Sequence, residues 1–324
     1  ILSEYSPEIE IYSIDECFLK LQGFEHFNLQ DYGSEMLHKV VKWTGIPISV
    51  GMAPTKALSK VANRIAKKYP EKTGGVYIID SEEKRIKALK WLKVEDVWGI
   101  GRQLSKRLKA MNVYTAFEFT QLSDQVVQKQ MSIVGLRLKH DLQGIPTLDL
   151  EETQAKQSIA TTRTFERNYT QLEQLSERVS TFAVACAEKL RQQNSCCNSL
   201  MVFIHTNRHR SDLAQYRRNI VIQLPYPTNS NIELAKFALQ ALNLIFVQGY
   251  SYKKAGVIVQ DFTPSNITQG NLFENSDKRH IQLMQAIDHV NKTLGQQKIK
   301  LASQDAKRVW KMKQEKLSPR YSTK

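Results

Sequence analysis

The first 82 residues alternate between short apolar strands and amphipathic helices, a pattern that indicates part of an α+β domain. Residues 8–21 alternate apolar and polar side chains on both sides of residues 13–16, as the two strands of a hairpin would. Thr55 is placed to cap a helix that Pro70 ends, because proline cannot continue the hydrogen bonds of a helix. The other expected elements are the end of a helix at 1–5, a helix at 31–44, and strands at 46–52 and 75–80.

Residues 83–144 contain short helical segments separated by small turns, without a convincing strand. We therefore expect a small all-helical domain, followed by a linker at 145–156 that begins with isoleucine and proline. Further along, residues 263–278 are polar and poorly periodic, which is typical of a flexible connector. The last segment, 279–324, is expected to form a helix over 279–294 and to end in a basic stretch.

Strands and helices follow one another in a clear order between the linker and the connector, over residues 157–262. The order βαββαβ predicts a four-stranded sheet backed by two helices. The expected elements are strands at 157–167, 198–206, 219–225 and 254–261, and helices at 170–193 and 231–248. The sequence as a whole therefore predicts an α+β multidomain protein.

The charge of the chain indicates an anionic partner. Its 46 Lys and Arg residues outnumber 32 Asp and Glu residues, and the formal net charge is +14. Nucleic acid and a membrane surface both remain open on charge alone. Because no long apolar run and no signal peptide are present, we expect a cytoplasmic protein without a membrane partner. The four cysteines lack the spacing of a zinc site, so we expect reduced thiols.

Asp15 and Glu16 are the sharpest chemical feature of the amino-terminal region. Neighbouring side chains of a regular strand point to opposite faces, so two adjacent carboxylates can share an ion only where the strand turns. The expected hairpin supplies such a turn. Hard divalent ions such as Mg²⁺ bind carboxylate oxygens together with substrate phosphates. A solvated turn without a ligand is the alternative.

The motif Tyr-Ser-Ile-Asp-Glu at residues 12–16 resembles the second catalytic motif of the Y-family translesion DNA polymerases. The run Gly-Met-Ala-Pro-Thr-Lys-Ala-Leu-Ser-Lys-Val-Ala-Asn at residues 51–63 is similar to the palm helix of that family. The resemblance implies that Asp15 and Glu16 are catalytic and hold Mg²⁺ in a two-metal site. It also implies that Lys67 contacts the triphosphate of the incoming deoxynucleoside triphosphate. A solvated lysine face is the alternative for Lys67.

The sequence Val-Trp-Gly-Ile-Gly-Arg at residues 97–102 precedes an amphipathic segment and resembles the helix-hairpin-helix of the Y-family thumb. Glycines let a backbone approach a phosphate closely, and the N–H groups at the following helix start can receive it. We therefore expect Gly99, Gly101, Arg102 and Lys106 on the DNA backbone. A glycine-rich helix connection without a ligand is the alternative.

The same resemblance divides the rest of the chain. It implies a partial palm at 1–82, a thumb at 83–144 and a little finger at 157–262, in which strands present arginines to DNA phosphates without reading bases. The short peptide at 269–273 resembles the segment by which bacterial polymerases dock on the sliding clamp. The last segment, 279–324, looks like the carboxy-terminal extension of UmuC-type members. The residues expected to act are Arg163, Arg167, Arg208, Arg210, Arg217 and Arg218 on DNA, and Gln269, Leu272 and Phe273 on the clamp.

By resemblance, the function is error-prone translesion DNA synthesis on damaged primer-template DNA during the SOS response, with a processed UmuD dimer, RecA and the sliding clamp as partners. The family's first catalytic aspartate lies well upstream of residues 12–16, and we expect it, the steric gate and the fingers to be missing from this sequence. Polymerisation by this chain alone is therefore not expected. The alternatives are an inactive DNA- and clamp-binding remnant, and a basic helix-hairpin-helix nuclease or repair adaptor.

Overall fold

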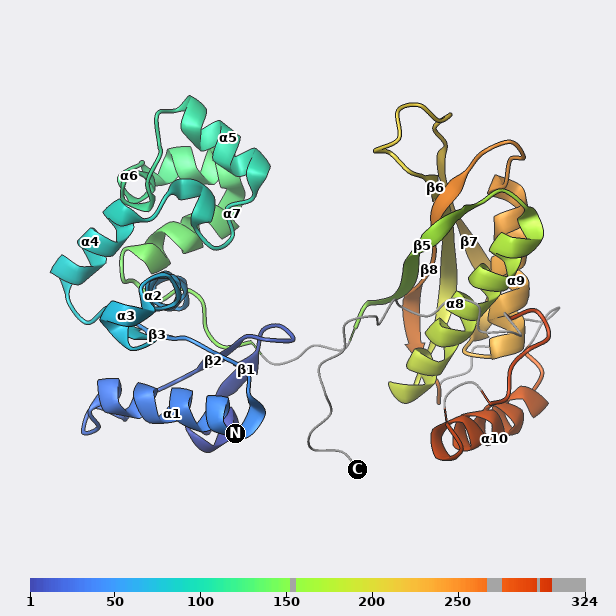
Figure 1. The fold of residues 1–324 in the computed structure, drawn as a ribbon, viewed down its shortest axis with the longest axis horizontal. Helices are drawn as coiled ribbons and strands as arrows, with labels where there is room; N and C mark the ends of the chain where they lie inside the picture. Colours follow the sequence, from blue (N-terminus) through green and yellow to red (C-terminus); the bar gives the residue numbers. More distant parts are fainter. Residues whose placement is uncertain (152–155, 267–275, 296–297, 305–324) are drawn as a thin grey trace. The chain divides into compact units, whose positions relative to one another are not determined.

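The computed structural model describes residues 1–151, 156–266, 276–295 and 298–304, and the chain forms two compact units, Ile1–Gln154 and Ala155–Lys324 (Figure 1). The boundary between them falls inside the predicted linker. Among the described residues, none of the helices is both long and apolar enough to cross a membrane.

The first unit contains two small sheets. The predicted hairpin is confirmed, because the first two strands pair antiparallel with Glu10 opposite Phe18. The other two strands pair in parallel, with Gly51 opposite Tyr77. The strand expected at 46–52 is shorter than predicted, since Pro47 has no N–H to donate to a ladder. The four strands are β1 (Ile9–Ile11), β2 (Cys17–Leu19), β3 (Val50–Met52) and β4 (Val76–Ile78).

Helices cover both faces of the β3–β4 pair. A Cβ atom at Gly33 would lie 2.8 Å from the side chain of Val76, so the first long helix packs closely on one face. A Cβ atom at Gly51 would lie 2.0 Å from the backbone N of Asn63, so the second long helix packs on the opposite face. Figure 1 shows the two helices on either side of β3. They are α1 (Leu29–Thr44) and α2 (Lys56–Lys68), and α2 is capped by Thr55 as predicted.

The remaining part of the first unit is helical, as expected for residues 83–144. The chain begins with a short 3₁₀ turn, η1 (Leu2–Glu4), in place of an α-helix end. Pro70 ends α2 and occupies the first turn of the next helix, where its missing N–H is not needed. The further elements are α3 (Pro70–Thr73), α4 (Glu82–Trp91), η2 (Val94–Asp96), α5 (Arg102–Ala110), α6 (Ala116–Thr120) and α7 (Asp124–Leu142).

One hydrophobic core runs through this unit. Leu58 and Val61 of α2 are buried in the same cluster as Leu89 of α4, Leu108 of α5 and Leu142 of α7. The sequence boundary placed at residue 82 therefore does not separate two hydrophobic cores. The helical part holds α2, and through α2 the hairpin, in place.

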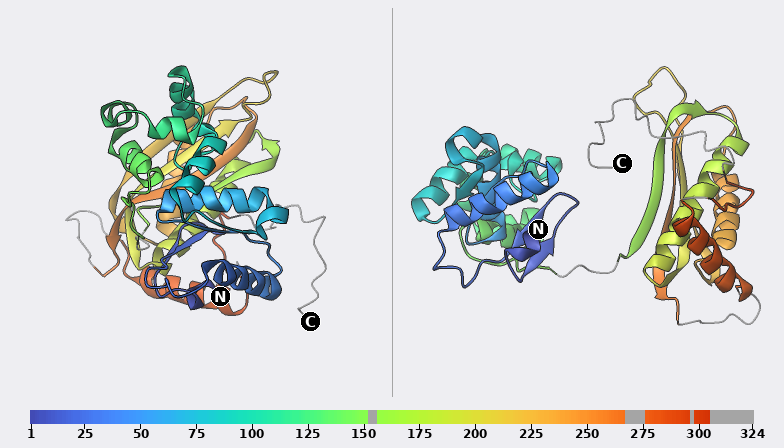
Figure 2. Two further views of the ribbon diagram at one scale, coloured as in Figure 1. Left: turned by 90° about the vertical axis from the view of Figure 1, so that its left-hand side faces the viewer. Right: turned by 60° about the horizontal axis from the view of Figure 1, so that its bottom comes forward.

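The second unit is a four-stranded antiparallel sheet with the order β5-β8-β6-β7. The predicted βαββαβ order and the two backing helices are confirmed, and Figure 2 shows both long helices on one face of the sheet. Six of the eight strand ends extend two or three residues beyond the predicted bounds, because pairing continues through polar residues that break the apolar pattern. The elements are β5 (Ser158–Tyr169), α8 (Leu172–Gln192), β6 (Ser195–Thr206), β7 (Arg217–Thr228), α9 (Asn231–Ile245) and β8 (Tyr252–Pro264).

A further helix, α10 (Arg279–Thr293), docks on the helical side of this unit. Arg191 of α8 forms a two-point ion pair with Asp288 of α10, with both N–O distances at 2.6 Å. Met284 and Ile287 of α10 are buried. The predicted helix at 279–294 is thus part of the folded second unit.

Candidate functional site

Asp15 and Glu16 lie at the tip of the β1–β2 hairpin, as the sequence predicted. The backbone N–H groups of Tyr12 and Ser13 both donate to the carbonyl oxygen of Glu16 at 3.0 Å, which closes the turn. The Ser13 hydroxyl donates to a carboxylate oxygen of Asp15 at 2.7 Å. Both acidic side chains are exposed. The turn therefore presents two adjacent carboxylates to solvent.

The basic face of α2 lies against acidic side chains. The Lys60 ammonium contacts Glu16 at 2.6 Å, and the Arg64 guanidinium contacts Asp96 at 2.6 Å. Lys56, one turn earlier, contacts Glu10 at 2.7 Å. In the structure these three cations are neutralised by side chains of the chain itself.

The Lys56–Glu10 pair is buried. The two side chains are 10% and 7% exposed. The same Glu10 oxygen accepts the backbone N–H of Glu151 at 2.8 Å, while Lys56 also donates to the carbonyl of Asp149 at 3.2 Å and lies 4.9 Å from the ring centroid of Phe18. We call this group the Lys56 clasp. It fixes the hairpin on α2 and holds residues 149–151 beside it.

The clasp was not predicted. The alternation of residues 8–21 gave the correct hairpin, but it does not say which face of the hairpin is buried. In the structure Glu10 is buried and Ile11 is 70% exposed. Glu10 faces inward because Lys56 and the Glu151 N–H satisfy its charge, and the only sequence signal was a lysine at the start of α2.

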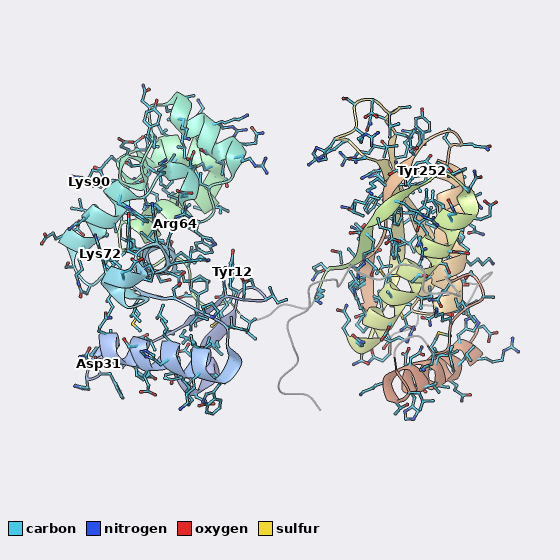
Figure 3. The ribbon with its side chains drawn as sticks, in the orientation of Figure 1. Tyr12, Asp31, Arg64, Lys72, Lys90 and Tyr252 are labelled. Atoms are coloured by element: carbon cyan, nitrogen blue, oxygen red, sulfur yellow. The ribbon has the colours of Figure 1, made fainter. Side chains whose placement is uncertain are left out.

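An aromatic contact brings the Gly99 turn to the hairpin. The indole N–H of Trp98 donates to the hydroxyl of Tyr12 at 2.9 Å, and the two rings meet edge to face with centroids 5.7 Å apart. The Lys60 ammonium lies 5.6 Å from the Tyr12 ring centroid. Figure 3 shows Tyr12 on the hairpin and Arg64 on α2. Two motifs whose contacting residues are 86 positions apart in sequence thus meet in one unit.

The fit of this site to a divalent cation is partial. Asp15 and Glu16 supply the oxygen donors that Mg²⁺ prefers. However, Glu16 is engaged by Lys60, and the described residues contain no group of three or more acidic, histidine or cysteine side chains placed to hold a metal. Lys67 is exposed on the last turn of α2. It lies about 10 Å along the helix from Lys60, given a rise of 1.5 Å per residue.

The glycines at 99 and 101 have different structural roles. Gly99 has a φ of +87°, which a side chain disfavours. Gly101 has ordinary backbone angles and is the residue before α5, and a Cβ atom there would meet nothing within 4 Å. The fold therefore does not require glycine at 101, although an approaching phosphate would. Arg102 and Lys106, on the first turns of α5, are exposed.

We predict that substitution of Gly101 mainly weakens DNA binding and that substitution of Gly99 mainly lowers stability. Gly101→Ala should weaken binding to primer-template DNA about fivefold, because its methyl group occupies the space of a phosphate. It should cost less stability than Gly99→Ala, because Gly101 has a negative φ and only its place before the first turn of α5 disfavours alanine. Gly99→Ala should cost about 1–2 kcal/mol of stability. Fluorescence anisotropy with labelled DNA and thermal unfolding measure both effects. A Gly101→Ala protein that binds DNA like the parent would contradict the phosphate role.

The six arginines expected on DNA lie in different places in the second unit. Arg217 pairs in register with His205 and Lys254 on the sheet face that α8 and α9 leave open. Arg163 is in register with the buried residue Ala255, and Arg218 with the buried residue Ile204. The side chains of both arginines therefore leave the backbone on the face that the helices cover. The other three arginines lie near one end of the sheet: Arg167 on β5, and Arg208 and Arg210 in the β6–β7 loop.

The row around Arg217 is cationic. Burial lowers the pKa of His205, and the neighbouring positive charges of Arg217 and Lys254 lower it further, so this imidazole stays neutral near pH 7. Arg210 forms an ion pair with Asp212 at 2.6 Å. Among the predicted arginines, Arg217 therefore has the placement that best suits a duplex lying on the open face. The predicted clamp residues, Gln269, Leu272 and Phe273, lie outside the described residues.

Comparison with known proteins gives matches along the chain. Residues 1–64 match the impB/mucB/samB family, residues 156–272 match the C-terminal domain of that family, and residues 282–324 match a domain of unknown function, DUF4113. Protein UmuC of Salmonella typhimurium is 36% identical over 327 residues, covering 100% of this chain and 78% of its own. Protein ImpB of the same organism is 35% identical, with 100% and 77% covered.

More distant proteins are also similar. DNA polymerase IV of Clostridium acetobutylicum is 22% identical over 302 residues, which cover 91% of this chain and 72% of that protein. A solved Y-family DNA polymerase chimera of Dbh and Dpo4 has a similar fold, with a TM-score of 0.59 and 19% identity over 81% of this chain and 73% of its own. The fold is therefore shared beyond the close relatives.

Proposed function

Because the chain belongs to the UmuC branch of the Y-family DNA polymerases, we propose that its first unit carries the acidic hairpin of a polymerase active site and that both units bind DNA. The family function is error-prone translesion DNA synthesis, a template-directed nucleotidyl transfer. The observation that carries the proposal is the contact of the Asp15–Glu16 hairpin with α2 and with the Trp98 turn.

Relatives of this kind depend on divalent metal ions, and we propose Mg²⁺ for this chain. Asp15 and Glu16 would hold the ion together with the phosphates of a deoxynucleoside triphosphate. Lys60 would release Glu16 when the ion arrives, because a divalent cation competes with a single ammonium for the same carboxylate. Lys67, on the same face of α2, is proposed to contact the triphosphate.

We propose that the DNA backbone is held at two places, each within its own unit. In the first unit, Gly101, Arg102 and Lys106 at the start of α5 would receive a phosphate. In the second unit, Arg217 and its neighbours on the open sheet face would contact the duplex. Such contacts neutralise phosphates and release counterions, so affinity should fall steeply with salt and depend little on sequence.

The proposed protein partners are the processed UmuD dimer, RecA and the sliding clamp. The support is the similarity to Protein UmuC along the whole chain. For the clamp, we propose that Leu272 and Phe273 fill an apolar groove while Gln269 forms hydrogen bonds.

A DNA-binding role without catalysis is the second candidate. Its support is that Glu16 is paired with Lys60 and that the described residues hold no group of three metal-binding side chains. In this case the chain would bind primer-template DNA but would not extend a primer.

Primer extension past an abasic site with Mg²⁺, compared with DNA binding in the same buffer, tests the proposal. Where the parent chain extends the primer, Asp15→Asn should reduce extension at least about 100-fold, because the metal loses a charged ligand, while DNA affinity changes less than about twofold. Ile14→Ala is the matched control, because Ile14 is fully exposed in the same turn and its substitution leaves both carboxylates. Binding without extension by the parent chain supports the second candidate. Failure to bind DNA at low salt excludes both.

A further inference from the structure

Strand β4 has a free edge. It pairs with β3, where the Val50 N–H donates to the carbonyl of Gly75 and the Ile79 N–H donates to the carbonyl of Met52, both at 2.9 Å. Successive residues of a strand direct their backbone groups to opposite edges, so the N–H and C=O groups of Val76 and Ile78 point away from β3. Within the described ranges, no hydrogen-bond partner lies at these four groups.

A pocket of about 890 Å³ runs along this edge. Val76, Tyr77 and Ile78 all line it, although the side chains of consecutive strand residues point to opposite faces. Leu29 at the start of α1 and Ile65 near the end of α2 line it as well, and these helices cover opposite faces of the β3–β4 pair. A hollow that touches both faces and both covering helices must lie at the strand edge. We call it the β4 edge pocket.

The β4 edge pocket has an aromatic wall and a cationic rim. The Trp91 indole donates to the Tyr69 hydroxyl at 3.0 Å, and the two rings form one surface of the lining. Lys84 at the rim is held by Asp80 at 2.8 Å. Lys72, labelled in Figure 3, lies 6.0 Å from the Tyr69 ring centroid and has no acidic partner in the described part of the chain. An apolar group and a carboxylate would both find complementary neighbours here.

We propose that the β4 edge pocket binds an extended peptide of a partner protein, which adds to the sheet as a strand. Its backbone would pair with Val76 and Ile78, an apolar side chain would pack on Tyr69 and Trp91, and a carboxylate would meet Lys72. Because β4 is three residues long, the backbone supplies few hydrogen bonds, and the pocket side chains supply the specificity.

Backbone pairing explains the site better than base stacking does. The Lys68 ammonium lies 5.7 Å from the centroid of Tyr69 and 5.1 Å from that of Trp91, but Lys68 does not line the pocket, so this cation does not decide between the two ligands. A peptide strand satisfies the unpaired backbone groups of the edge, which a nucleotide would leave exposed.

The probe is a short fluorescein-labelled peptide in which valine and threonine alternate around one phenylalanine and one aspartate. We expect it to bind the full chain with a Kd of about 10–100 µM, and its backbone N-methylated form to bind at least about tenfold more weakly. The methylated form leaves the protein unchanged, so its result does not depend on the folding of any variant. Equal binding of the two peptides, or no binding of either, would overturn the proposal.

Two variants locate the site. Ile78→Pro removes an N–H that points away from β3, which an edge strand tolerates, and should reduce binding about tenfold, whereas Ile78→Val should bind like the parent. Lys72→Glu should reverse the preference towards a probe with lysine in place of aspartate. Loss of binding in folded Ile78→Val, an unchanged preference in Lys72→Glu, or displacement of the probe by single-stranded oligothymidine would each contradict strand addition at this pocket.

Discussion

Replacing Lys56 with methionine is expected to lower the free energy of unfolding of the first unit by about 3–5 kcal/mol, because it leaves the Glu10 carboxylate buried without its cation. Glu10 is 7% exposed, and its remaining described partner would be the Glu151 N–H. The hydrogen bond to the Asp149 carbonyl and the ring contact with Phe18 would be lost at the same time. Urea unfolding followed by hydrogen exchange in β1 and β2 measures the loss and locates it at the hairpin.

Two controls separate burial from charge. Lys60→Met removes a cation of the same helix face whose pair with Glu16 is partly exposed, and should cost less than about 1 kcal/mol. The double variant Glu10→Leu with Lys56→Met removes both buried charges and should recover most of the stability, because an apolar pair of similar volume often replaces a buried ion pair. A Lys56→Met protein as stable as Lys60→Met would show that the clasp does not hold the hairpin.

The hairpin shows which features of the fold could be predicted from the sequence and which could not. The period of two and the turn at residues 13–16 predicted the pairing of β1 with β2, and the structure has it. Alternation does not say which face is buried when both faces carry apolar residues. Which face is buried depends on Lys56, 46 positions from Glu10 in the sequence, and on the N–H of Glu151, 141 positions from Glu10. Long-range pairing of a charge leaves no local signal, so the inward direction of Glu10 could not be predicted.

The second unit was easier to predict. Its strands and helices are long, and buried residues such as Val179 and Phe182 recur at helical spacing, so the order and the two layers were correct. The six arginines were chosen because they lie on or near the predicted strands, without knowledge of the strand register. Strand register decides that Arg217 lies on the open face of the sheet while the Arg218 side chain leaves the backbone on the helix-covered face. A shift of the register by one residue would exchange the faces of these two arginines.

Asp141 should be the second position at which a substitution causes a large loss of stability. It is fully buried at the end of α7, where one carboxylate oxygen accepts the Ala57 N–H at 3.1 Å and the other accepts the Thr147 N–H at 2.9 Å. Asp141→Ala would leave these donors buried without a partner and remove a negative charge from the start of α2, a loss of about 2–4 kcal/mol. Asp141→Asn, which keeps one acceptor oxygen, should lose about half as much.

The first turn of α2 links the Asp141 hydrogen bonds to the Lys56 clasp, so the two predictions are coupled. Asp141 binds the N–H of Ala57, which directly follows Lys56, and fraying of this turn would release the ammonium from Glu10. The double variant Asp141→Ala with Lys56→Met should therefore lose less stability than the sum of the single variants, by about 1 kcal/mol or more. Urea unfolding of the four proteins measures this difference. Strict additivity would mean that the helical part stabilises α2 without positioning the hairpin.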